Sequence, residues 1–289
     1  MRVFDSVWGP KYIGYMIGAY LRRMTYTLEL IVRASGSNIR WRLVVALILA
    51  LYPGRMRKQS GKAGELLDLA IARLLRGRVL PLKGVKYCLT DEESLYILAP
   101  RNEAWMWSYL NPKRGDTLID VGAHIGKYAL WGARMVGERG RVIALEPYQV
   151  NYDALVSGIS ENGFRNIIAL KYAAWHEDRV LRLFLSESSG GSVKVNSGFG
   201  YSQVSARSLD SITQDLGVTH VDWVKIDAEG AEFEILCGSV HLLSRDAPKV
   251  IMEVSRSDAS RVDDFMKQLG YSGITIHETP VYLYMYYLQ

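Results

Sequence analysis

The chain has 289 residues, of which 49% are hydrophobic, so it can bury a sizeable core and is not a disordered protein. Its two cysteines, Cys88 and Cys237, lie far apart without C-x-x-C spacing, and they predict buried packing residues rather than a disulfide framework or a zinc cluster. The net charge of +5 is uneven, because residues 1–115 hold 19 Lys and Arg against 8 Asp and Glu, whereas residues 116–289 hold 16 against 22.

The front of the chain is a basic segment, with a charge of +11 over residues 1–115. Such an excess is typical of proteins that bind an anionic partner, such as RNA, a phospholipid surface or a phosphorylated metabolite. The alternative is that these cations only line the solvated faces of helices. Residues 1–83 are the predicted contact for an RNA or membrane partner.

Residues 1–83 are also predicted to be mainly helical. Apolar residues at helical spacing predict an amphipathic helix over 11–33, and a more apolar helix over 40–52 ends at Pro53. A third helix is predicted over 64–75. Basic amphipathic helices with aromatic residues bind membrane interfaces, and the alternative is a small helical layer with the aromatic residues in its core.

No segment of the sequence is predicted to cross a membrane. The longest unbroken apolar run, residues 43–52, is about half of the ~20 residues that a spanning helix needs. Residues 1–5 lack the apolar region of a signal peptide. These features predict a cytoplasmic protein, with peripheral association at a membrane as the alternative.

Residues 84–289 are predicted to form a second domain, in which residues 84–115 lead into the core. The lead-in is predicted to hold a hairpin with strands at 85–90 and 94–99, followed by a short helix over 103–110. The lead-in therefore ends just before the first strand of the core.

From Thr117 onward, strand-like and helical patterns alternate, and this alternation predicts a parallel sheet with helices on both faces. Residues 116–289 form the predicted core. The predicted strands span 117–122, 141–146, 167–172, 222–227 and 249–255. The predicted helices lie near 126–137, 148–162, 209–217, 231–243 and 258–269.

Two hairpins interrupt or end this alternation. An insertion at residues 180–208, with a Gly/Ser-rich loop, predicts a hairpin that flanks the substrate side of the sheet. The chain closes with predicted strands at 273–278 and 281–288, joined at Thr279 and Pro280.

The most informative motif is Asp-Val-Gly-Ala-His-Ile-Gly at residues 120–126, which joins the first predicted strand to the first helix. Gly122 and Gly126 can adopt backbone angles closed to other residues and let a ligand lie against the main chain. The free N–H groups of a helix start favour electron-rich atoms, so a nucleotide-like cofactor suits this turn. The spacing is not that of the dinucleotide fingerprint, and the acid at position 120 suits a ligand that carries a cation.

Three later segments complete the pattern, and each ends a predicted strand. They are Val-Ile-Ala-Leu-Glu-Pro at 142–147, Val-Lys-Ile-Asp-Ala-Glu-Gly-Ala-Glu at 224–232 and Val-Ile-Met-Glu-Val at 250–254. Together with the 120–126 turn, these segments resemble the S-adenosylmethionine-dependent methyltransferases, and specifically the FkbM family. The resemblance covers the chain from about residue 100 to its end.

The resemblance implies the α/β, Rossmann-like class I methyltransferase fold, a seven-stranded and mostly parallel sheet whose last strand is antiparallel. It also implies an enzyme that binds S-adenosylmethionine. In an open parallel sheet, such a ligand lies at the carboxyl ends of the strands, where the strand order reverses.

The resemblance assigns the cofactor site to the ends of the first strands. Asp120 is expected to hold the turn and to attract the amino or sulfonium end of the cofactor, and the alternative is that it caps the next helix. Glu146 is expected to bind the ribose hydroxyls, because its two oxygens suit a vicinal diol; the alternative is an exposed acid before Pro147. The predicted cofactor-binding residues are Asp120, Gly122, Ala123, His124, Gly126, Glu146, Pro147, Ala174 and Asp227.

Three of the other residues near the cofactor have open roles. Backbone groups of Ala174, in the loop after the third strand, are expected to reach the adenine. Trp175 either stacks on the base or packs in the core. His124 either shapes the glycine turn through a hydrogen bond or acts directly in catalysis.

Asp227 and Glu229 are the predicted catalytic residues, because they follow the fourth strand between the cofactor and any acceptor. A base that accepts the hydroxyl proton adds about 10²–10⁴ to the rate, while alignment supplies most of the remainder. No metal is predicted, although Asp227, Glu229 and Glu253 would suit Mg²⁺ better than Zn²⁺ as a carboxylate set. The alternative for Glu229 and Glu232 is that they stabilise the start of the helix near Gly230.

The function expected from this resemblance is O-methylation of a hydroxyl on a sugar, a glycolipid or a small metabolite. The first alternative is an RNA methyltransferase that holds the phosphate backbone through residues 1–83, although the Lys-Asp-Lys-Glu set of ribose methyltransferases needs a lysine where Glu253 stands. The second alternative is a non-enzymatic membrane-associated or scaffolding protein, against which the intact cofactor motifs argue. The sequence leaves the acceptor open.

Overall fold

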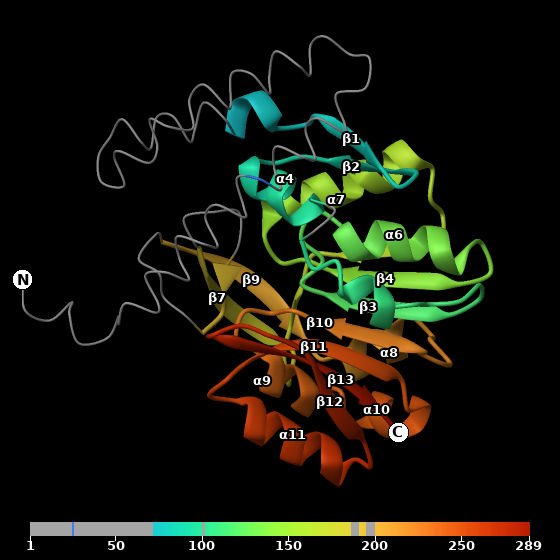
Figure 1. Cartoon of the computed structure of the whole chain (residues 1–289), viewed down its shortest axis with the longest axis vertical. Helices are drawn as coiled ribbons and strands as arrows, with labels where there is room; N and C mark the ends of the chain where they lie inside the picture. Colours follow the sequence, from blue (N-terminus) through green and yellow to red (C-terminus); the bar gives the residue numbers. More distant parts are fainter. Residues whose placement is uncertain (1–24, 26–71, 100–101, 186–190, 195–199) are drawn as a thin grey trace, which may run out of the picture. The chain divides into compact units, whose positions relative to one another are not determined.

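The computed structural model describes residues 25, 72–99, 102–185, 191–194 and 200–289 (Figure 1). The predicted helices over 11–33 and 40–52 lie outside these residues except at Thr25, and they stay predictions. Of the predicted anionic contact over 1–83, only residues 25 and 72–83 are described, and this contact also stays a prediction. The end of the third predicted helix is helical at residues 72–75. None of the helices in the described part of the chain is long and apolar enough to cross a bilayer.

Contacts divide the chain into two units. The first holds residues 1–76 and 91–104, and the second holds residues 77–90 and 105–289. In the first unit, helix α4 spans Glu92–Leu98. The Asp91 carboxylate accepts a hydrogen bond from Ser94 N at 3.0 Å, and Asp91 N donates to Ser94 Oγ at 3.3 Å.

This capping box starts a helix, so the predicted strand at 94–99 is wrong. The hairpin of the lead-in lies earlier, in the second unit, where β1 (Val79–Leu82) pairs with β2 (Val85–Cys88). Lys83 and Gly84 join the two strands, and both have positive φ, as a two-residue hairpin turn requires. The predicted short helix is confined to α5 (Met106–Tyr109).

A seven-stranded sheet is the centre of the second unit. Its strands in chain order are β3 (Thr117–Val121), β4 (Arg141–Leu145), β5 (Ile167–Leu170), β10 (Trp223–Ile226), β11 (Lys249–Ser255), β12 (Ser272–Glu278) and β13 (Tyr282–Leu288). Their spatial order is β12-β13-β11-β10-β3-β4-β5. Strand β13 is antiparallel to both of its neighbours, whereas β3, β4, β5, β10 and β11 pair in parallel, which confirms the predicted fold class.

Helices cover both faces of this sheet, as the alternating pattern predicts. Figure 1 shows α6 (Lys127–Val136) and α7 (Gln149–Asn162) on one side of the sheet, and α9 (Glu232–Cys237), α10 (Val240–Asp246) and α11 (Ala259–Gln268) on the other. Each central strand therefore has both faces buried: the four residues of β10 are all buried.

The predicted helix over 231–243 is interrupted between α9 and α10. A Cβ atom at Gly238 would lie 2.2 Å from the Trp175 carbonyl oxygen, so the chain passes too close to that loop for any side chain. Asp210, in helix α8 (Leu209–Asp215), then accepts hydrogen bonds from His241 N and Leu242 N at the start of α10. The break is thus stabilised from outside the segment.

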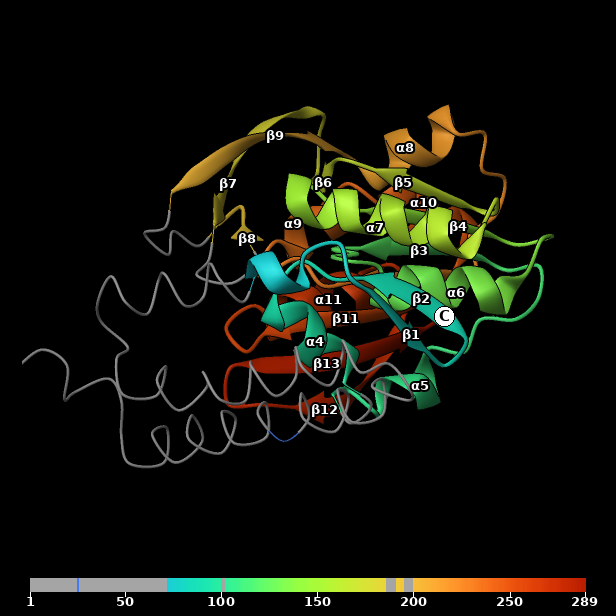
Figure 2. The ribbon, with the colours of Figure 1, turned by 90° about the horizontal axis from the view of Figure 1, so that it is seen from above.

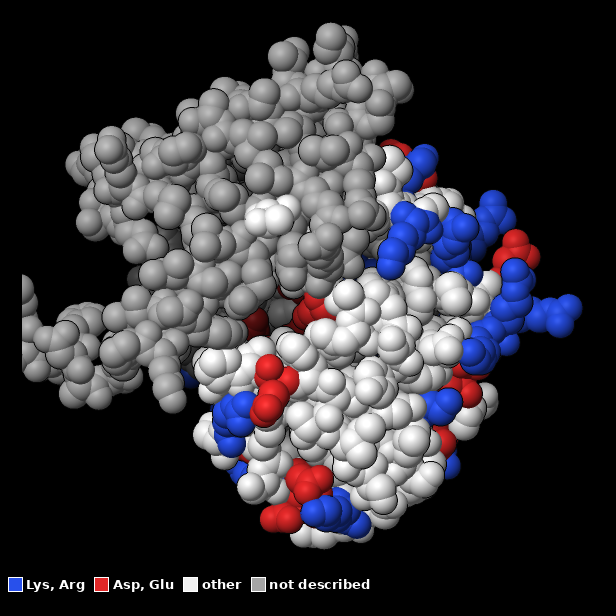
Figure 3. All heavy atoms as spheres, in the orientation of Figure 1, with Lys and Arg blue, Asp and Glu red and all other residues white. Residues whose placement is uncertain are grey.

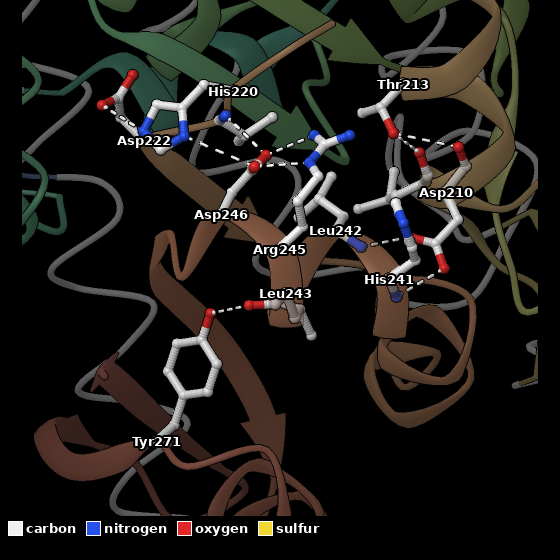
Figure 4. Close-up of polar contacts among 12 residues, drawn as sticks. Asp210, Thr213, His220, Asp222, His241, Leu242, Leu243, Arg245, Asp246 and Tyr271 are labelled. Carbon is white, nitrogen blue, oxygen red and sulfur yellow. Dashed lines mark hydrogen bonds and ion pairs between the residues drawn. The ribbon is translucent and has the colours of Figure 1, made fainter.

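A polar network fixes where β10 begins relative to β3 (Figure 4). His220 lies between the carboxylates of Asp222 and Asp246, at 3.3 and 3.6 Å, and Asp246 also accepts from Val221 N at 2.9 Å. Asp222 Oδ2 accepts from Thr117 N, the first residue of β3, at 2.7 Å. These contacts set the register that brings the carboxyl ends of the two strands together.

The predicted insertion, together with the preceding strand β6, forms a separate four-stranded sheet of order β6-β9-β7-β8. Strands β7 (Arg179–Leu185) and β9 (Tyr201–Arg207) are an antiparallel pair, as predicted, and β6 (Ala173–Ala174) pairs with β9. Strand β8 is the short segment Gly191–Ser192. Figure 2 shows β7 and β9 extending beyond one end of the main sheet.

Aromatic residues gather on one face of the C-terminal strands. Trp105 stacks on His277 with ring centroids 4.9 Å apart and lies 4.6 Å from Tyr284, and Tyr286 lies near Tyr109 and Trp223. Figure 3 shows few charged side chains over these strands. Cys88 is buried as predicted, but the prediction for Cys237 is wrong, because this residue ends α9 in an exposed position.

Candidate functional site

The four sequence motifs meet at one edge of the main sheet. From β3 the chain moves outward through β4 and β5 and then returns to β10 on the opposite side of β3, so the strand order reverses between β3 and β10. In parallel sheets this reversal opens a crevice at the carboxyl ends of the strands. Asp120, Glu146, Asp227 and Glu253 all lie at or near those ends.

The glycine turn is folded tightly over the end of β4. The N–H groups of Gly122 and Ala123 both donate to the Leu145 carbonyl oxygen, at 3.0 and 2.9 Å. Gly122, His124 and Gly126 have φ values of 72°, 52° and 92°, in the region that favours glycine. A Cβ atom on Gly122 would lie 1.9 Å from the Asp227 carbonyl oxygen, so the turn packs directly against the exit of β10.

Replacing Gly122 by alanine is expected to lower the free energy of unfolding by about 3 kcal/mol or more, because a left-handed residue and a backbone clash both add cost. The matched control is Gly163→Ala, since Gly163 has a φ of 65° but no atom within 4 Å of its Cβ position. That control is expected to lose only about 1–2 kcal/mol. Chemical denaturation measures both, and equal losses would contradict the close packing.

Glu146 is a buried carboxylate that contacts the glycine turn directly. It is 5% exposed, and its two oxygens accept hydrogen bonds from His124 N at 2.8 Å and Tyr148 N at 2.9 Å. The alternative of an exposed acid is therefore wrong. Burial raises the pKa of Glu146 to about 7, against the lowering effect of the two N–H donors. Each oxygen keeps acceptor capacity, so the residue fits a vicinal diol.

Asp120 is fully buried and lies beside Lys225, a residue that the motif assignment missed. The Lys225 ammonium is 3.2 Å from Asp120 Oδ1, and strand register aligns the two residues. Burial raises the pKa of Asp120, while Lys225 and the Ala129 N–H in the first turn of α6 lower it. The sequence does hold a signal for this pair, because a lysine within the fully buried strand β10 requires a carboxylate partner.

Asp227 and Glu229 follow β10 at the same edge. The Asp227 side chain is 31% exposed and its Oδ2 lies 3.5 Å from the Lys225 ammonium. Glu229 has a φ of 53°, and its Oε2 lies 3.5 Å from the hydroxyl of Tyr282. The sequence motifs missed Tyr282, because only the antiparallel direction of β13 brings its first residue to this edge.

Glu232 has a local structural role. It is 2% exposed, and its Oε1 accepts from Ala228 N at 3.2 Å and Gly230 N at 3.0 Å. The alternative of helix-start stabilisation therefore describes Glu232 well. Burial raises its pKa to about 7, as for Glu146.

The predicted carboxylate set of Asp227, Glu229 and Glu253 does not converge. Among the described residues, no three Asp, Glu, His or Cys side chains are placed to hold a metal ion together. Glu253 lies at the same height along the sheet as Asp227, because the residues that precede them, Met252 and Ile226, are paired.

The loop that is predicted to reach the adenine is built into the four-stranded sheet. Ala174 is buried, and Trp175 N donates to the Arg207 carbonyl oxygen at 2.9 Å. The Trp175 side chain packs against the hydrophobic cores of both sheets, which favours the packing role. The roles of Ala174 and Pro147 toward a cofactor stay predictions.

Comparison with known proteins identifies a protein family whose domain matches this chain. The methyltransferase FkbM domain matches residues 120–272. Methyltransferase FkbM from Methylobacillus flagellatus KT is similar with a TM-score of 0.48 and 18% identity, over 68% of this chain and 54% of that chain. This chain thus spans about half the length of that structure.

Two further solved structures are similar in fold. A SAM-dependent methyltransferase from Aquifex aeolicus has a TM-score of 0.38 and 14% identity, over 61% of this chain and 83% of that chain. Aeropyrum pernix fibrillarin, in complex with natively bound S-adenosyl-L-methionine, has a TM-score of 0.46 and 17% identity, over 73% and 82%. No curated protein matches this chain.

Proposed function

Because this chain belongs to the FkbM methyltransferase family, we propose that it methylates a hydroxyl oxygen of a sugar, a glycolipid or another small metabolite. Membership of the family makes the chain an S-adenosylmethionine-dependent methyltransferase. The oxygen acceptor and the residues that serve it are the proposal, and the following observations support it.

The observation that carries the proposal is the Asp227 carboxylate. It lies at the reversal of strand order and is partly exposed, whereas Asp120 and Glu146 are buried. A partly exposed carboxylate beside a buried ammonium is placed to accept a proton from an acceptor hydroxyl. Asp227 is therefore the base that we assign to the reaction.

The chain's own residues divide the remaining work. Glu146 binds the ribose hydroxyls, and the turn at 120–126 supplies the main-chain surface against which the nucleoside lies. When bound, S-adenosylmethionine supplies the electrophilic methyl group. The acceptor hydroxyl loses its proton to Asp227 as its oxygen takes the methyl group, and the thioether S-adenosylhomocysteine leaves.

The carboxylates around Tyr282, on the side of the site where the acceptor would lie, favour a neutral, hydroxyl-rich acceptor. Burial raises the pKa of Tyr282, and the carboxylates of Glu229, Glu253, Glu232 and Asp227 raise it further, so its hydroxyl stays protonated and able to donate. Carboxylates at this edge repel a phosphodiester backbone. This observation favours a sugar or glycolipid over RNA.

The proposal is tested by supplying methyl-tritiated S-adenosylmethionine with free sugars, glycolipids and total RNA in parallel. We expect label in a sugar-bearing acceptor, and mass spectrometry of the product is expected to place the added methyl group on oxygen. Label found only in RNA, or on a nitrogen atom of the product, would contradict the proposed acceptor.

A further inference from the structure

Lys225 is a buried cation with two carboxylates within 4 Å of its ammonium. Its side chain is 4% exposed, and its ammonium lies 3.2 Å from Asp120 Oδ1 and 3.5 Å from Asp227 Oδ2. A buried ammonium is costly unless charges and hydrogen bonds compensate it. A lysine buried at this position therefore needs more than one partner to compensate its charge.

The main chain of the glycine turn is part of that environment. The Lys225 ammonium donates to the Gly122 carbonyl oxygen at 3.3 Å and is within 3.5 Å of the Val121 carbonyl oxygen. The Tyr128 ring in α6 lies 5.3 Å away, measured from its centroid. One ammonium thus joins the end of β3, the glycine turn and the exit of β10.

We propose that Lys225 is a positioning residue for methyl transfer, which holds the Gly122 carbonyl and the Asp227 carboxylate in place. In this account Asp120 is the internal counter-ion of Lys225, and it does not attract the cofactor's cation directly. The inference rests on the role proposed above for Asp227.

The difference in exposure between the two carboxylates supports this assignment. Asp120 is fully buried against Lys225, so its charge is neutralised inside the protein. Asp227 is 31% exposed, and its Oδ2 lies 3.5 Å from the same ammonium. Burial raises the pKa values of Asp120 and Glu146, and Lys225 opposes both shifts, so one lysine acts on both of these buried carboxylates.

A single variant and a charge-balanced double variant together separate a positioning role of Lys225 from simple neutralisation of the Asp120 charge. The single variant Lys225→Met leaves a buried carboxylate alone, and it is expected to lose thermal stability together with affinity for S-adenosylhomocysteine. The double variant Asp120→Asn/Lys225→Met removes both charges. It is expected to recover most of the stability, since no unpaired charge stays buried.

The decisive measurement is the affinity of the double variant for S-adenosylhomocysteine, determined by calorimetry. We expect it to stay about tenfold to a hundredfold below that of the natural protein, the range for losing one hydrogen bond to a charged group. Its turnover number is expected to stay reduced as well. Recovery of natural affinity and turnover in the stable double variant would overturn the proposal.

The matched control is Lys267→Met, which removes a surface lysine paired with Asp263 at 2.6 Å in α11. It is expected to leave both affinity and turnover unchanged. Because calorimetry needs no acceptor, a wrong acceptor would leave the Lys225 result readable. A failure of the function proposed above is therefore distinguishable from a failure of this inference.

Discussion

Replacing Asp227 by asparagine is expected to slow methyl transfer by about 10²–10⁴-fold, the contribution of a positioned base. The substitution keeps the shape of the side chain beside Lys225 but removes the acceptor for the hydroxyl proton. Because we assign the ribose contact to Glu146, affinity for S-adenosylmethionine is expected to fall far less than the rate. Single-turnover kinetics at saturating cofactor measure the loss.

Glu229→Gln is the comparison that tests the assignment. Glu229 is at the same edge, but its carboxylate reaches the Tyr282 hydroxyl at 3.5 Å, whereas that of Asp227 reaches Lys225. We expect this variant to retain most of the rate. A larger loss in Glu229→Gln than in Asp227→Asn would move the base to Glu229 and contradict the assignment.

Replacing Glu146 by alanine is expected to reduce affinity for S-adenosylhomocysteine by about a hundredfold or more, because the proposed charge-assisted bonds to the ribose would be lost. The substitution also leaves the N–H groups of His124 and Tyr148 without their acceptor. Isothermal titration calorimetry measures the change. An affinity equal to that of the natural protein would remove the ribose assignment.

The raised pKa of Glu146, about 7, gives this site a pH dependence of definite sign. In the free protein, the contribution of Glu146 to stability is present below its ordinary pKa and is lost as pH rises through about 7. In the proposed ribose contact the hydroxyls would donate to the ionised carboxylate, so cofactor affinity is expected to rise between about pH 6 and pH 8. Glu146→Gln is expected to flatten that rise.

Glu232→Gln is the matched control for this pH dependence. Glu232 is equally buried and has the same raised pKa, but its Oε1 serves the N–H groups of Ala228 and Gly230. We expect the control to keep both the cofactor affinity and its rise with pH. If it flattened the rise as Glu146→Gln does, the titrating group would be wrongly assigned.

The central sheet could be predicted because its signals are local and repeated. Each of the strands β3, β4, β10 and β11 is a short apolar run that ends in a distinctive acid or glycine motif. Parallel strands also need long connections, which make the alternation with helices easy to read. The carboxyl-edge position of Asp120, Glu146 and Asp227 then follows from strand direction alone.

The secondary-structure predictions that proved wrong lie where a specific contact outweighs the apolar pattern of the segment. Residues 94–99 look like a strand, but the capping box of Asp91 with Ser94 begins a helix. The helix predicted over 231–243 breaks at Gly238, because the Trp175 backbone approaches from a different part of the chain. Neither contact is visible in the periodicity of the segment.

The partners of the site depend on register and direction, which the motifs do not encode. Lys225 belongs to a recognised motif, but its role depends on alignment with Asp120 across two strands. Tyr282 reaches the site only because β13 runs against β11. Such cross-strand residues need a three-dimensional structure before a role can be assigned.

The most direct test of this account is a crystal structure of the full chain with S-adenosylhomocysteine bound. We expect both ribose hydroxyls to donate to the Glu146 carboxylate and the sulfur to face Asp227. A ribose bound away from Glu146, or a sulfur turned from Asp227, would contradict it.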